Sequence, residues 1–172
     1  MNPGTGWLAG PLPEQARTRF YGKYRGIVSD VDARTCRIKA KVPAVLGDAD
    51  SGWCMPCVPY AGPNVGIAFL PEVGSGVWVE FEGGDVSFPI WAGCYWRDGE
   101  VPPNVGDHVK VVVTAAPHTL ILDDDQRRIT LSDPNGNAVT LDATGITLSK
   151  SGQQVVVSAA SVSVNNGALE VR

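Results

Sequence analysis

The order of hydrophobic and polar positions predicts β-strands in the first part of the chain. Residues 36–42, CRIKAKV, alternate without error, with Cys36, Ile38, Ala40 and Val42 on one face and three basic residues on the other. This alternation predicts a half-buried strand. The preceding YRGIVSDV, joined to it by the turn DART, completes a predicted hairpin.

Further short strands are predicted at GIAFLP (66–71), GVWVEFE (76–82) and PIWAGCYW (89–96). The chain holds 20 glycines and 13 prolines, which favour frequent turns over long helices. Residues 22–96 are therefore predicted to form about five or six short antiparallel strands that close into a small barrel. One short helix is predicted over residues 12–22.

A second pattern follows a Pro- and Gly-rich connector, residues 97–117, which contains an isolated VKVVV strand. In the last part of the chain apolar residues come in i, i+2 pairs that start 9, 10, 7, 9, 7 and 7 residues apart, with turn clusters such as DPNGN and NNG between them. This is a degenerate repeat with one short strand per unit. The pairs are Leu120/Leu122, Ile129/Leu131, Val139/Leu141, Ile146/Leu148, Val155/Val157, Val162/Val164 and Leu169/Val171.

The repeat cannot hold itself folded in a single chain. Burying the two aliphatic side chains of one unit contributes roughly 3–6 kcal/mol, whereas ordering about eight residues costs roughly 8–16 kcal/mol in backbone entropy. No helix or second sheet is encoded to cover the apolar face. We therefore expect this face to meet copies of the chain or a partner, most economically in a closed symmetric assembly that also removes exposed strand edges.

Charge argues against a nucleic-acid-binding role. The chain of 172 residues has a net charge of −4, and residues 1–100 hold 9 basic and 11 acidic residues. Nucleic-acid-binding domains usually carry a basic patch. The row Arg37, Lys39 and Lys41 is predicted to be a solvated or protein-docking face, and a barrel that binds single-stranded nucleic acid or polysaccharide is the alternative.

The stretch WCMPC, with Cys54 and Cys57, is close to the signature of thioredoxin-like redox sites. Such a dithiol needs a helix directly after it, because the helix N-terminus lowers the pKa of the nucleophilic thiol. The following VPYAGPNVG cannot begin a helix, and a zinc site would need two more ligands at suitable spacing. We expect two thiols in a strand, with no catalytic, cofactor or metal site, and a dithiol oxidoreductase is the third hypothesis.

The stretch DPNGNAVTLDAT, residues 133–144, begins like a calcium-binding loop. It has Ala138 at the sixth position, where that loop needs glycine, and Thr144 at the twelfth, where it needs a bidentate glutamate. The stretch is therefore predicted to be a turn between two strands.

Residues 58–96 resemble the oligonucleotide/oligosaccharide-binding (OB) barrel of contractile-tail spike proteins, the phage baseplate assembly protein V family and the VgrG-type spikes of type VI secretion. Residues 118–149, HTLILDDDQRRITLSDPNGNAVTLDATGITLS, are similar to the family's transition into its triple-stranded β-helix. Together the two stretches extend the resemblance over roughly residues 22–172. The matching barrel positions are Trp53, Ala61, Gly62, Phe69, Pro71, Glu72, Gly74, Val77, Val79, Phe81, Gly84, Asp85, Pro89 and Gly93.

The resemblance implies an all-β homotrimer. Its parts are an N-terminal arm (1–21), an OB-fold barrel (22–96), a connector (97–117) and an intertwined triple-stranded β-helix (118–172), whose trimer core is the fourteen aliphatic residues of the repeat. It implies a structural spike and no enzyme: the barrels dock on the baseplate hub, and the β-helix pierces the target envelope when the sheath contracts.

The resemblance also implies partners and a location. The barrel end meets a hub protein, and the needle has transient contact with the target membrane. No histidine follows His118, so we expect no metal-binding apex but a separate tip protein of the PAAR-repeat type at the C-terminal end. Nucleic acid is not an expected partner. The implied location is the baseplate of a virion or phage tail-like particle, with assembly in the bacterial cytoplasm.

Overall fold

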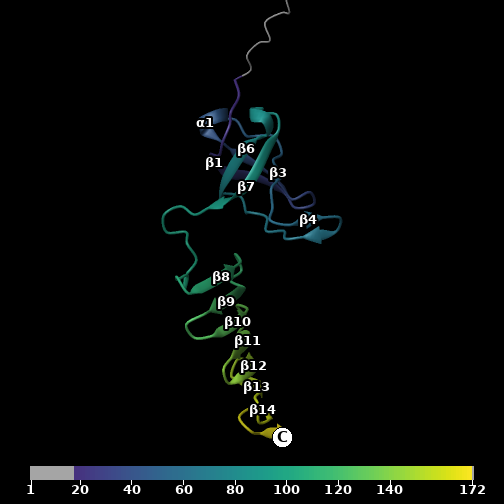
Figure 1. Cartoon of the computed structure of the whole chain (residues 1–172), viewed down its shortest axis with the longest axis vertical. Coiled ribbons are helices and arrows are strands. Elements are labelled where there is room, and N and C mark those ends of the chain that lie inside the picture. Colours follow the sequence, from purple (N-terminus) through teal and green to yellow (C-terminus); the bar gives the residue numbers. More distant parts are fainter. Residues whose placement is uncertain (1–17, 172) are drawn as a thin grey trace, which may run out of the picture. The chain divides into compact units, whose positions relative to one another are not determined.

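The computed structural model describes residues 18–171, in two compact units that divide between Gly99 and Glu100 (Figure 1). Both units consist of β-strands, which confirms the predicted all-β class. In the described residues the helices are α1 (Pro43–Leu46) and the 3-10 turn η1 (Glu82–Gly84), and neither is long enough to cross a membrane. The strands of the first unit are β1 (Tyr24–Asp32), β2 (Arg37–Lys41), β3 (Met55–Pro56), β4 (Ala61–Gly62), β5 (Val65–Gly66), β6 (Gly76–Phe81) and β7 (Pro89–Tyr95).

Five strands of the first unit form one sheet in the order β2-β1-β6-β7-β3. Its two edge strands meet, because Ile38 of β2 forms an antiparallel bridge with Cys54, next to β3, and the Cys54 amide donates to the Ile38 carbonyl at 2.8 Å. The sheet is thereby closed into the predicted barrel. One pairing differs from the prediction, because β3 runs parallel to β7.

The barrel core follows from the alternation in the sequence. Ile38, Ala40 and Val42 are fully buried, as the pattern of residues 36–42 predicts. Cys36 is half-buried and lies in the hairpin turn with φ of 52°. The core also contains Val28, Cys54, Val77, Val79, Phe81 and Trp91.

The described end of the predicted arm belongs to the barrel. The prediction of a helix over 12–22 is wrong for residues 18–22, which are not helical, and residues 1–17 lie outside the described part of the chain. The Phe20 ring packs against the core, its amide donates to the Gly84 carbonyl at 2.9 Å, and the Arg19 guanidinium lies 3.3 Å from the Asp85 carboxylate. These long-range contacts hold the backbone extended.

The predicted strand GIAFLP is also wrong. Only Gly66 of this segment lies in a strand, β5, which pairs with β4 in a separate two-stranded sheet. Residues 67–70 form no ladder with the barrel sheet. Ile67 and Phe69 are exposed, and only Leu70 packs against the core.

The second unit is an eight-stranded antiparallel sheet, with each strand beside its sequence neighbour from β8 to β15. The prediction that VKVVV is an isolated connector strand is wrong, because β8 pairs along its whole length with β9. All these pairings lie within one chain, and intertwining with other chains is a prediction for the trimer. The strands are β8 (Val109–Val113), β9 (Thr119–Asp123), β10 (Arg128–Ser132), β11 (Asn137–Asp142), β12 (Gly145–Lys150), β13 (Gln153–Val157), β14 (Val162–Val164) and β15 (Leu169–Val171).

The tight turns of this sheet depend on residues that tolerate positive φ. Ser151 and Gly152 turn between β12 and β13, and Asn165 and Asn166 begin the turn after β14, all with positive φ. Gly145 is the most constrained position: its φ is 140°, and a Cβ there would lie 2.0 Å from the Val157 carbonyl oxygen. Only glycine fits this approach of β12 to the end of β13.

The buried core predicts where the barrel is sensitive to truncation. Val79 is fully buried, whereas Val73 is 64% exposed. Val79→Ala leaves a cavity and should cost about 1–3 kcal/mol, whereas Val73→Ala should change stability by less than about 0.5 kcal/mol.

The five tryptophans all precede residue 97, so the thermal transition of tryptophan fluorescence reports on the first unit alone. We expect the midpoint to fall by about 5–15 °C for Val79→Ala. Equal midpoints for the two variants would contradict this assignment of the core.

Candidate trimer interface

The aliphatic pairs of the repeat form two unbroken columns on one face of the second unit's sheet. Residues directly opposite each other on antiparallel strands project to the same face, as do residues i and i+2 of one strand. The first column contains Leu120, Leu131, Val139, Leu148, Val155, Val164 and Leu169, each paired with the next. The second column contains Leu122, Ile129, Leu141, Ile146, Val157, Val162 and Val171 in the same way.

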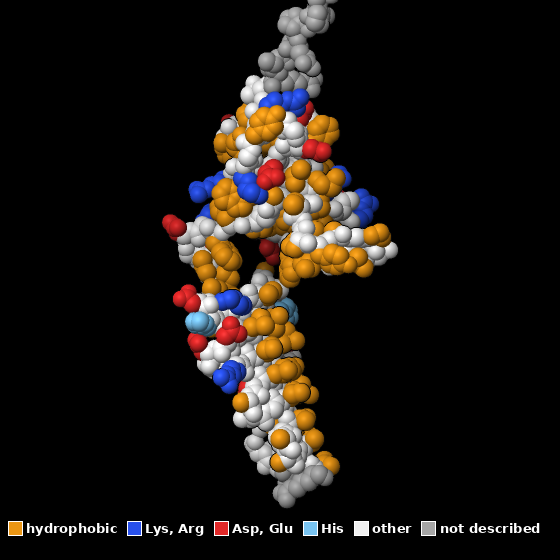
Figure 2. Space-filling model, viewed as in Figure 1, with side chains coloured by type: hydrophobic (Ala, Val, Ile, Leu, Met, Phe, Trp, Pro, Cys, Tyr) orange, Lys and Arg blue, Asp and Glu red, His pale blue; other side chains and the backbone are white. Residues whose placement is uncertain are grey.

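This face is uncovered in the single chain. Every residue of the second column is exposed, and Leu131 of the first column is 54% exposed. The column between them on the opposite face contains Thr130, Thr140 and Thr147, which are partly buried, whereas the whole second aliphatic column is exposed. Figure 2 shows hydrophobic side chains gathered along one side of this unit. In a sheet that forms its own core the aliphatic side chains are buried and the polar ones exposed. Here the aliphatic side chains are exposed, so the aliphatic face needs an outside partner.

The first column extends one strand further than the sequence pattern indicated. Val112 of β8 lies opposite Leu120 and continues the first column. Lys110 lies opposite Leu122 and ends the second column, and its ammonium group donates to the Asp107 carbonyl. The alternation alone does not indicate Val112, because its strand follows a Pro- and Gly-rich segment and was predicted to belong to the connector.

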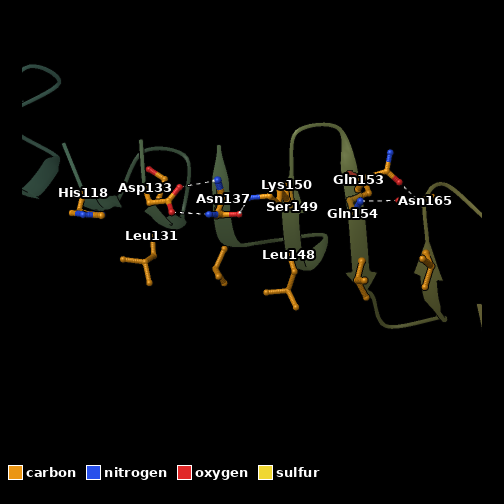
Figure 3. Close-up of a pocket in the computed structure, with 15 residues that line it drawn as sticks. His118, Leu131, Asp133, Asn137, Leu148, Ser149, Lys150, Gln153, Gln154 and Asn165 are labelled. Carbon is orange, nitrogen blue, oxygen red and sulfur yellow. Dashed lines mark hydrogen bonds between the residues drawn. The ribbon is translucent and has the colours of Figure 1, made fainter. Parts of the chain in front are cut away.

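An open groove of about 680 Å³ runs beside the first column, with Leu131 and Leu148 on its apolar side (Figure 3). Polar side chains line its other side and bond to one another across strands. The Lys150 ammonium group donates to Asn137 Oδ1 at 2.9 Å, and Asn165 Nδ2 donates to Gln153 Oε1 at 2.5 Å. These bonds satisfy polar groups of Lys150, Asn137, Asn165 and Gln153 within the chain.

The prediction of a turn over residues 133–144 is confirmed only in part: residues 133–136 form the turn after β10, whereas Asn137–Asp142 form β11. Asp133 Oδ1 accepts the amides of Asn135 and Asn137, both at 2.9 Å, and Asp133 Oδ2 accepts the Asn137 side-chain amide at 2.6 Å. The side-chain bond from Asn137 is the largest cause that lowers the pKa of Asp133 to about 2. The carboxylate therefore stabilises a turn, as in an Asx motif.

The OB-motif residues lie in strands and turns at several points of the first unit, and they do not form one site. Phe81 is in the core and Pro71 is buried. The turn that precedes β6 is held by the Ser75 amide, which donates to the Glu72 carbonyl at 3.1 Å. Gly74 in this turn has φ of 92° and donates its amide to the Val28 carbonyl at 2.9 Å.

The remaining motif residues lie at other points of the first unit. Gly84 is buried, and a Cβ there would lie 3.0 Å from atoms of Arg19 and Phe20. Asp85 Oδ1 accepts the Ser87 amide at 3.0 Å. Gly93 has φ of 116° where the β6–β7 register shifts. Gly62 lies in β4, and Trp53 directly precedes Cys54, with its ring centroid 4.6 Å from the Lys39 ammonium group.

The basic row of β2 is largely paired within the chain. The Lys39 ammonium group lies 3.5 Å from the Asp30 carboxylate, and that of Lys41 lies 3.5 Å from the Asp50 carboxylate. Arg37 reaches the Met55 sulfur at 4.0 Å. These acidic neighbours offset the positive charge that a phosphate-binding surface would need.

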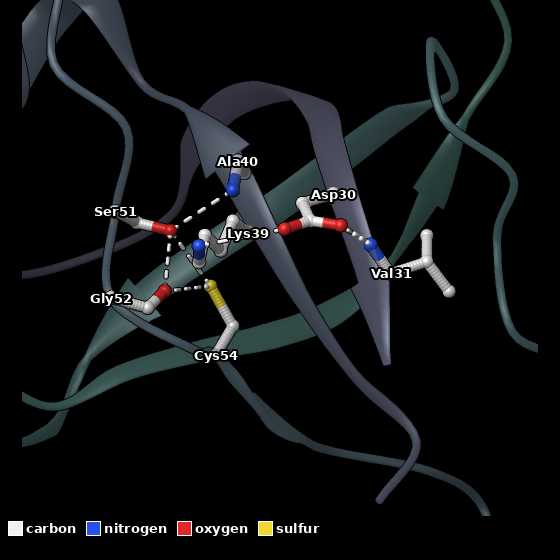
Figure 4. A network of polar contacts seen from close by, with 7 residues as sticks. All are labelled: Asp30, Val31, Lys39, Ala40, Ser51, Gly52 and Cys54. Carbon is white, nitrogen blue, oxygen red and sulfur yellow. Dashed lines mark hydrogen bonds and ion pairs between the residues drawn. The ribbon is translucent and has the colours of Figure 1, made fainter. Parts of the chain in front are cut away.

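The two cysteines of WCMPC have different surroundings, and Figure 4 shows those of Cys54. Cys54 is buried and its sulfur lies 3.3 Å from Ser51 Oγ, which accepts the Ala40 amide at 2.9 Å. Burial is the main cause that raises the pKa of the Cys54 thiol. Cys57 is exposed, and both thiols are free.

A charge in the second column should abolish self-association. Leu141→Asp places a carboxylate in the middle of the apolar face, where the implied trimer brings three copies together without cationic partners. We expect the mass of the purified chain, measured by light scattering after size exclusion, to fall from three chains to one.

Thr140→Asp is the matched control, because residue 140 is the sequence neighbour on the opposite face. It should remain trimeric. A Leu141→Asp chain that keeps the mass of three chains would show that the columns are not the interface.

The lowered pKa of Asp133 predicts acid sensitivity in the second unit. The folded pKa of about 2 lies below the usual value near 3.9, so the stabilising contribution is complete above about pH 4 and is lost as pH falls toward about 2. In thermal unfolding followed by circular dichroism, Asp133→Asn should lose less stability than the native chain over this range. Asp125→Asn, in the turn before β10, is the charge-matched control. Equal acid dependence of all three chains would contradict the role of Asp133.

Each of the two units matches a known protein family. Residues 24–96 match the family described as the Type VI secretion system/phage-baseplate injector OB domain. Residues 109–170 match the phage baseplate V C-terminal trimerisation domain. No curated protein matches the chain at a significant level.

The two matched ranges agree with the two units of the structure. The first contains the closed barrel, and the second begins at β8, with the first strand of the aliphatic sheet. The columns therefore lie in a trimerisation domain, and the chain has a spike-type structural role in an injection baseplate. The chain belongs to the family of phage baseplate V and VgrG-type proteins.

Proposed function

We propose that three copies of the chain form the central spike of a contractile injection machine, which pierces the target envelope when the sheath contracts. The observation that carries this proposal is the pair of aliphatic columns, which continue in cross-strand register from β9 to β15 without cover. Three such sheets, packed face to face around one axis, bury all six columns. Covering each half-exposed aliphatic side chain contributes on the order of 1 kcal/mol.

A trimer built in this way suits a mechanical load. The hydroxyl-bearing face, with Thr130, Thr140 and Thr147, is turned to water, and the apolar face forms one continuous core. Because packed interiors are dense and resist deformation, bending the needle would open contacts along its whole length. Many equivalent layers share the force, so no single contact has to carry it.

The ends of the assembly have different partners in this proposal. The barrels dock on the baseplate hub, as the resemblance implies. At the other end, β15 is the outermost strand of the described sheet and leaves Leu169 and Val171 exposed. An apolar outer strand is a pairing hazard unless it is covered. We assign a separate tip protein of the PAAR-repeat type to this end, with transient membrane contact during injection. Assembly takes place in the cytoplasm of the bacterium that makes the particle.

The chain has no catalytic role in this proposal. A dithiol nucleophile needs a lowered thiol pKa, whereas burial raises that of Cys54. The residues after Cys57 lead into the β4–β5 hairpin and begin no helix.

A barrel that binds single-stranded nucleic acid or polysaccharide has one supporting observation. The Arg25 guanidinium lies 5.7 Å from the ring centroids of both Trp78 and Tyr95, an arrangement on which a base or sugar could stack. Lys39 and Lys41 nearby on β2 are paired with acids, which weakens this alternative.

The test is delivery by particles that carry variant spikes. Ile146→Asp places a charge in the second column, whereas Thr147→Asp changes its neighbour on the opposite face. We expect Ile146→Asp particles to lose the spike and to deliver at least tenfold less, while Thr147→Asp particles remain active. Normal delivery by particles whose spike no longer trimerises would overturn the proposal.

The double variant Cys54→Ser, Cys57→Ser separates mechanics from redox chemistry in the same assay. A serine hydroxyl at 54 can donate to the Gly52 carbonyl, toward which the thiol now points at 3.7 Å. We expect nearly unchanged trimer mass and delivery. Loss of delivery with the trimer intact would assign a function to the thiols.

A further inference from the structure

Three side chains form a cluster on the outer face of the barrel sheet, and we call Arg25, Trp78 and Tyr95 the stacking platform. Arg25 of β1 lies directly opposite Trp78 of β6, and Tyr95 of β7 lies opposite Gly76 of β6. Gly76 and Trp78 are two residues apart on one strand, so all four residues project to the same face. The intervening Val77 points the other way and is fully buried, which identifies the platform's face as the outer one.

The two rings of the platform are held in place by the backbone beneath them. A Cβ on Gly76 would lie 2.8 Å from atoms of the Tyr95 ring, so this ring rests directly on β6. The Tyr95 hydroxyl donates to the Gly26 carbonyl of β1 at 3.3 Å. The Trp78 ring lies beside it, with centroids 5.1 Å apart and planes tilted by 51°. Both aromatic residues are half-buried, so the platform is a fixed surface that solvent reaches.

Arg25 gives the platform a positive charge that no acid neutralises. Its guanidinium carbon lies 5.7 Å from both ring centroids, and the residue is exposed. Among residues 18–171 no ion pair involves Arg25, whereas four other cations of the first unit each lie within 3.5 Å of a carboxylate: Arg19, Lys23, Lys39 and Lys41. A guanidinium group that packs on aromatic rings keeps N–H donors for a carboxylate.

We propose that the stacking platform binds an acidic polysaccharide, one whose sugar units carry carboxylates. The C–H groups on the flat face of a sugar ring pack on the electron-rich faces of aromatic rings. Trp78 and Tyr95 supply two such faces side by side, and Arg25 supplies the charge that complements a carboxylate on the same sugar or the next one.

The charges around the platform favour a polysaccharide over a nucleic acid. Proteins that bind single strands neutralise several phosphates along a basic groove. Here Lys23, the next cation along β1, lies 2.8 Å from the Glu80 carboxylate. Glu80 is two residues from Trp78 on β6 and shares its face, so an acid flanks the rings. One unpaired guanidinium group beside two rings matches one carboxylate per sugar.

The platform lies away from the face that OB folds usually use. Those folds bind oligonucleotides and oligosaccharides over their second and third strands, which are β2 and β3 among the five strands of this sheet. On that side Trp53 also stacks with a cation, Lys39, but Asp30 neutralises it. The inference therefore follows from the residues of β1, β6 and β7, and it does not depend on the piercing role.

The test is isothermal titration calorimetry of the purified full-length chain with a hexamer of galacturonic acid. We expect a Kd of roughly 0.1–1 mM. Three other hexamers should bind at least about tenfold more weakly. Maltohexaose has sugar rings without charge, hexaglutamate has carboxylates without sugar rings, and a thymidylate hexamer has bases and phosphates.

Two variants test the two parts of the platform. Trp78→Ala removes a stacking face and should weaken binding about tenfold or more. Arg25→Gln keeps an exposed polar side chain without the charge and should weaken it about fivefold or more. The matched controls are Trp53→Ala, whose ring stacks with a neutralised cation, and Arg34→Gln, whose side chain is also exposed. Both controls should bind as the native chain does, and every variant should keep the native mass in light scattering.

Four results would each overturn the proposal: no binding of the galacturonate hexamer, equal binding of maltohexaose or hexaglutamate, equal or tighter binding of the thymidylate hexamer, or native affinity in Arg25→Gln. Tighter binding of thymidylate would identify the platform as a nucleic-acid site instead. None of these results concerns the trimer mass or delivery by particles, so the proposed spike function would stand or fall separately.

Discussion

The aliphatic columns of the second unit have no cover within one chain, and the architecture of the protein follows from this deficit. Aliphatic residues line one face of the sheet from strand to strand, yet the sheet is a single layer that leaves this face exposed. A single layer cannot exclude water from both sides of its apolar residues, so the fold is complete only as an oligomer. The barrel satisfies the same requirement alone, because its sheet closes through Ile38 and Cys54 and buries Val79 inside.

This difference explains the composition of the two units. All tryptophan, tyrosine and phenylalanine residues precede residue 97. A barrel of five short strands needs a few large side chains, such as Trp91 and Phe81, to fill its interior. The second unit uses only valine, leucine and isoleucine in its columns, because each layer near a threefold axis must accept identical side chains from three directions. β-branched residues also favour the pleated backbone.

The sequence predicted the fourteen column residues but not their alignment. Their spacing varies between 7 and 10 residues, and nothing in the pattern shows that Leu131 lies opposite Val139. The register depends on turns of different length, set by local groups such as Asp133. The same limitation hid Val112, whose strand resembles a connector when its pairing with β9 is unknown. The wrong helix at Phe20 has a long-range cause, the bond from its amide to the Gly84 carbonyl. The wrong strand at GIAFLP has a local one, because Gly66 pairs with Ala61 in a short hairpin and residues 67–70 form no ladder.

The cysteine pair shows why a motif alone does not define chemistry. In a dithiol enzyme a helix N-terminus stabilises the thiolate, and access to solvent allows attack. Here Cys54 closes the barrel through its backbone, its side chain fills the core, and its sulfur contacts Ser51 inside the protein. Desolvation favours the neutral thiol, so the position that would hold the nucleophile is the one least suited to it. The tryptophan and cysteines at 53–57 therefore belong to the segment that closes the barrel, in which Cys54 pairs with Ile38 of β2 and the following strand β3 pairs with β7.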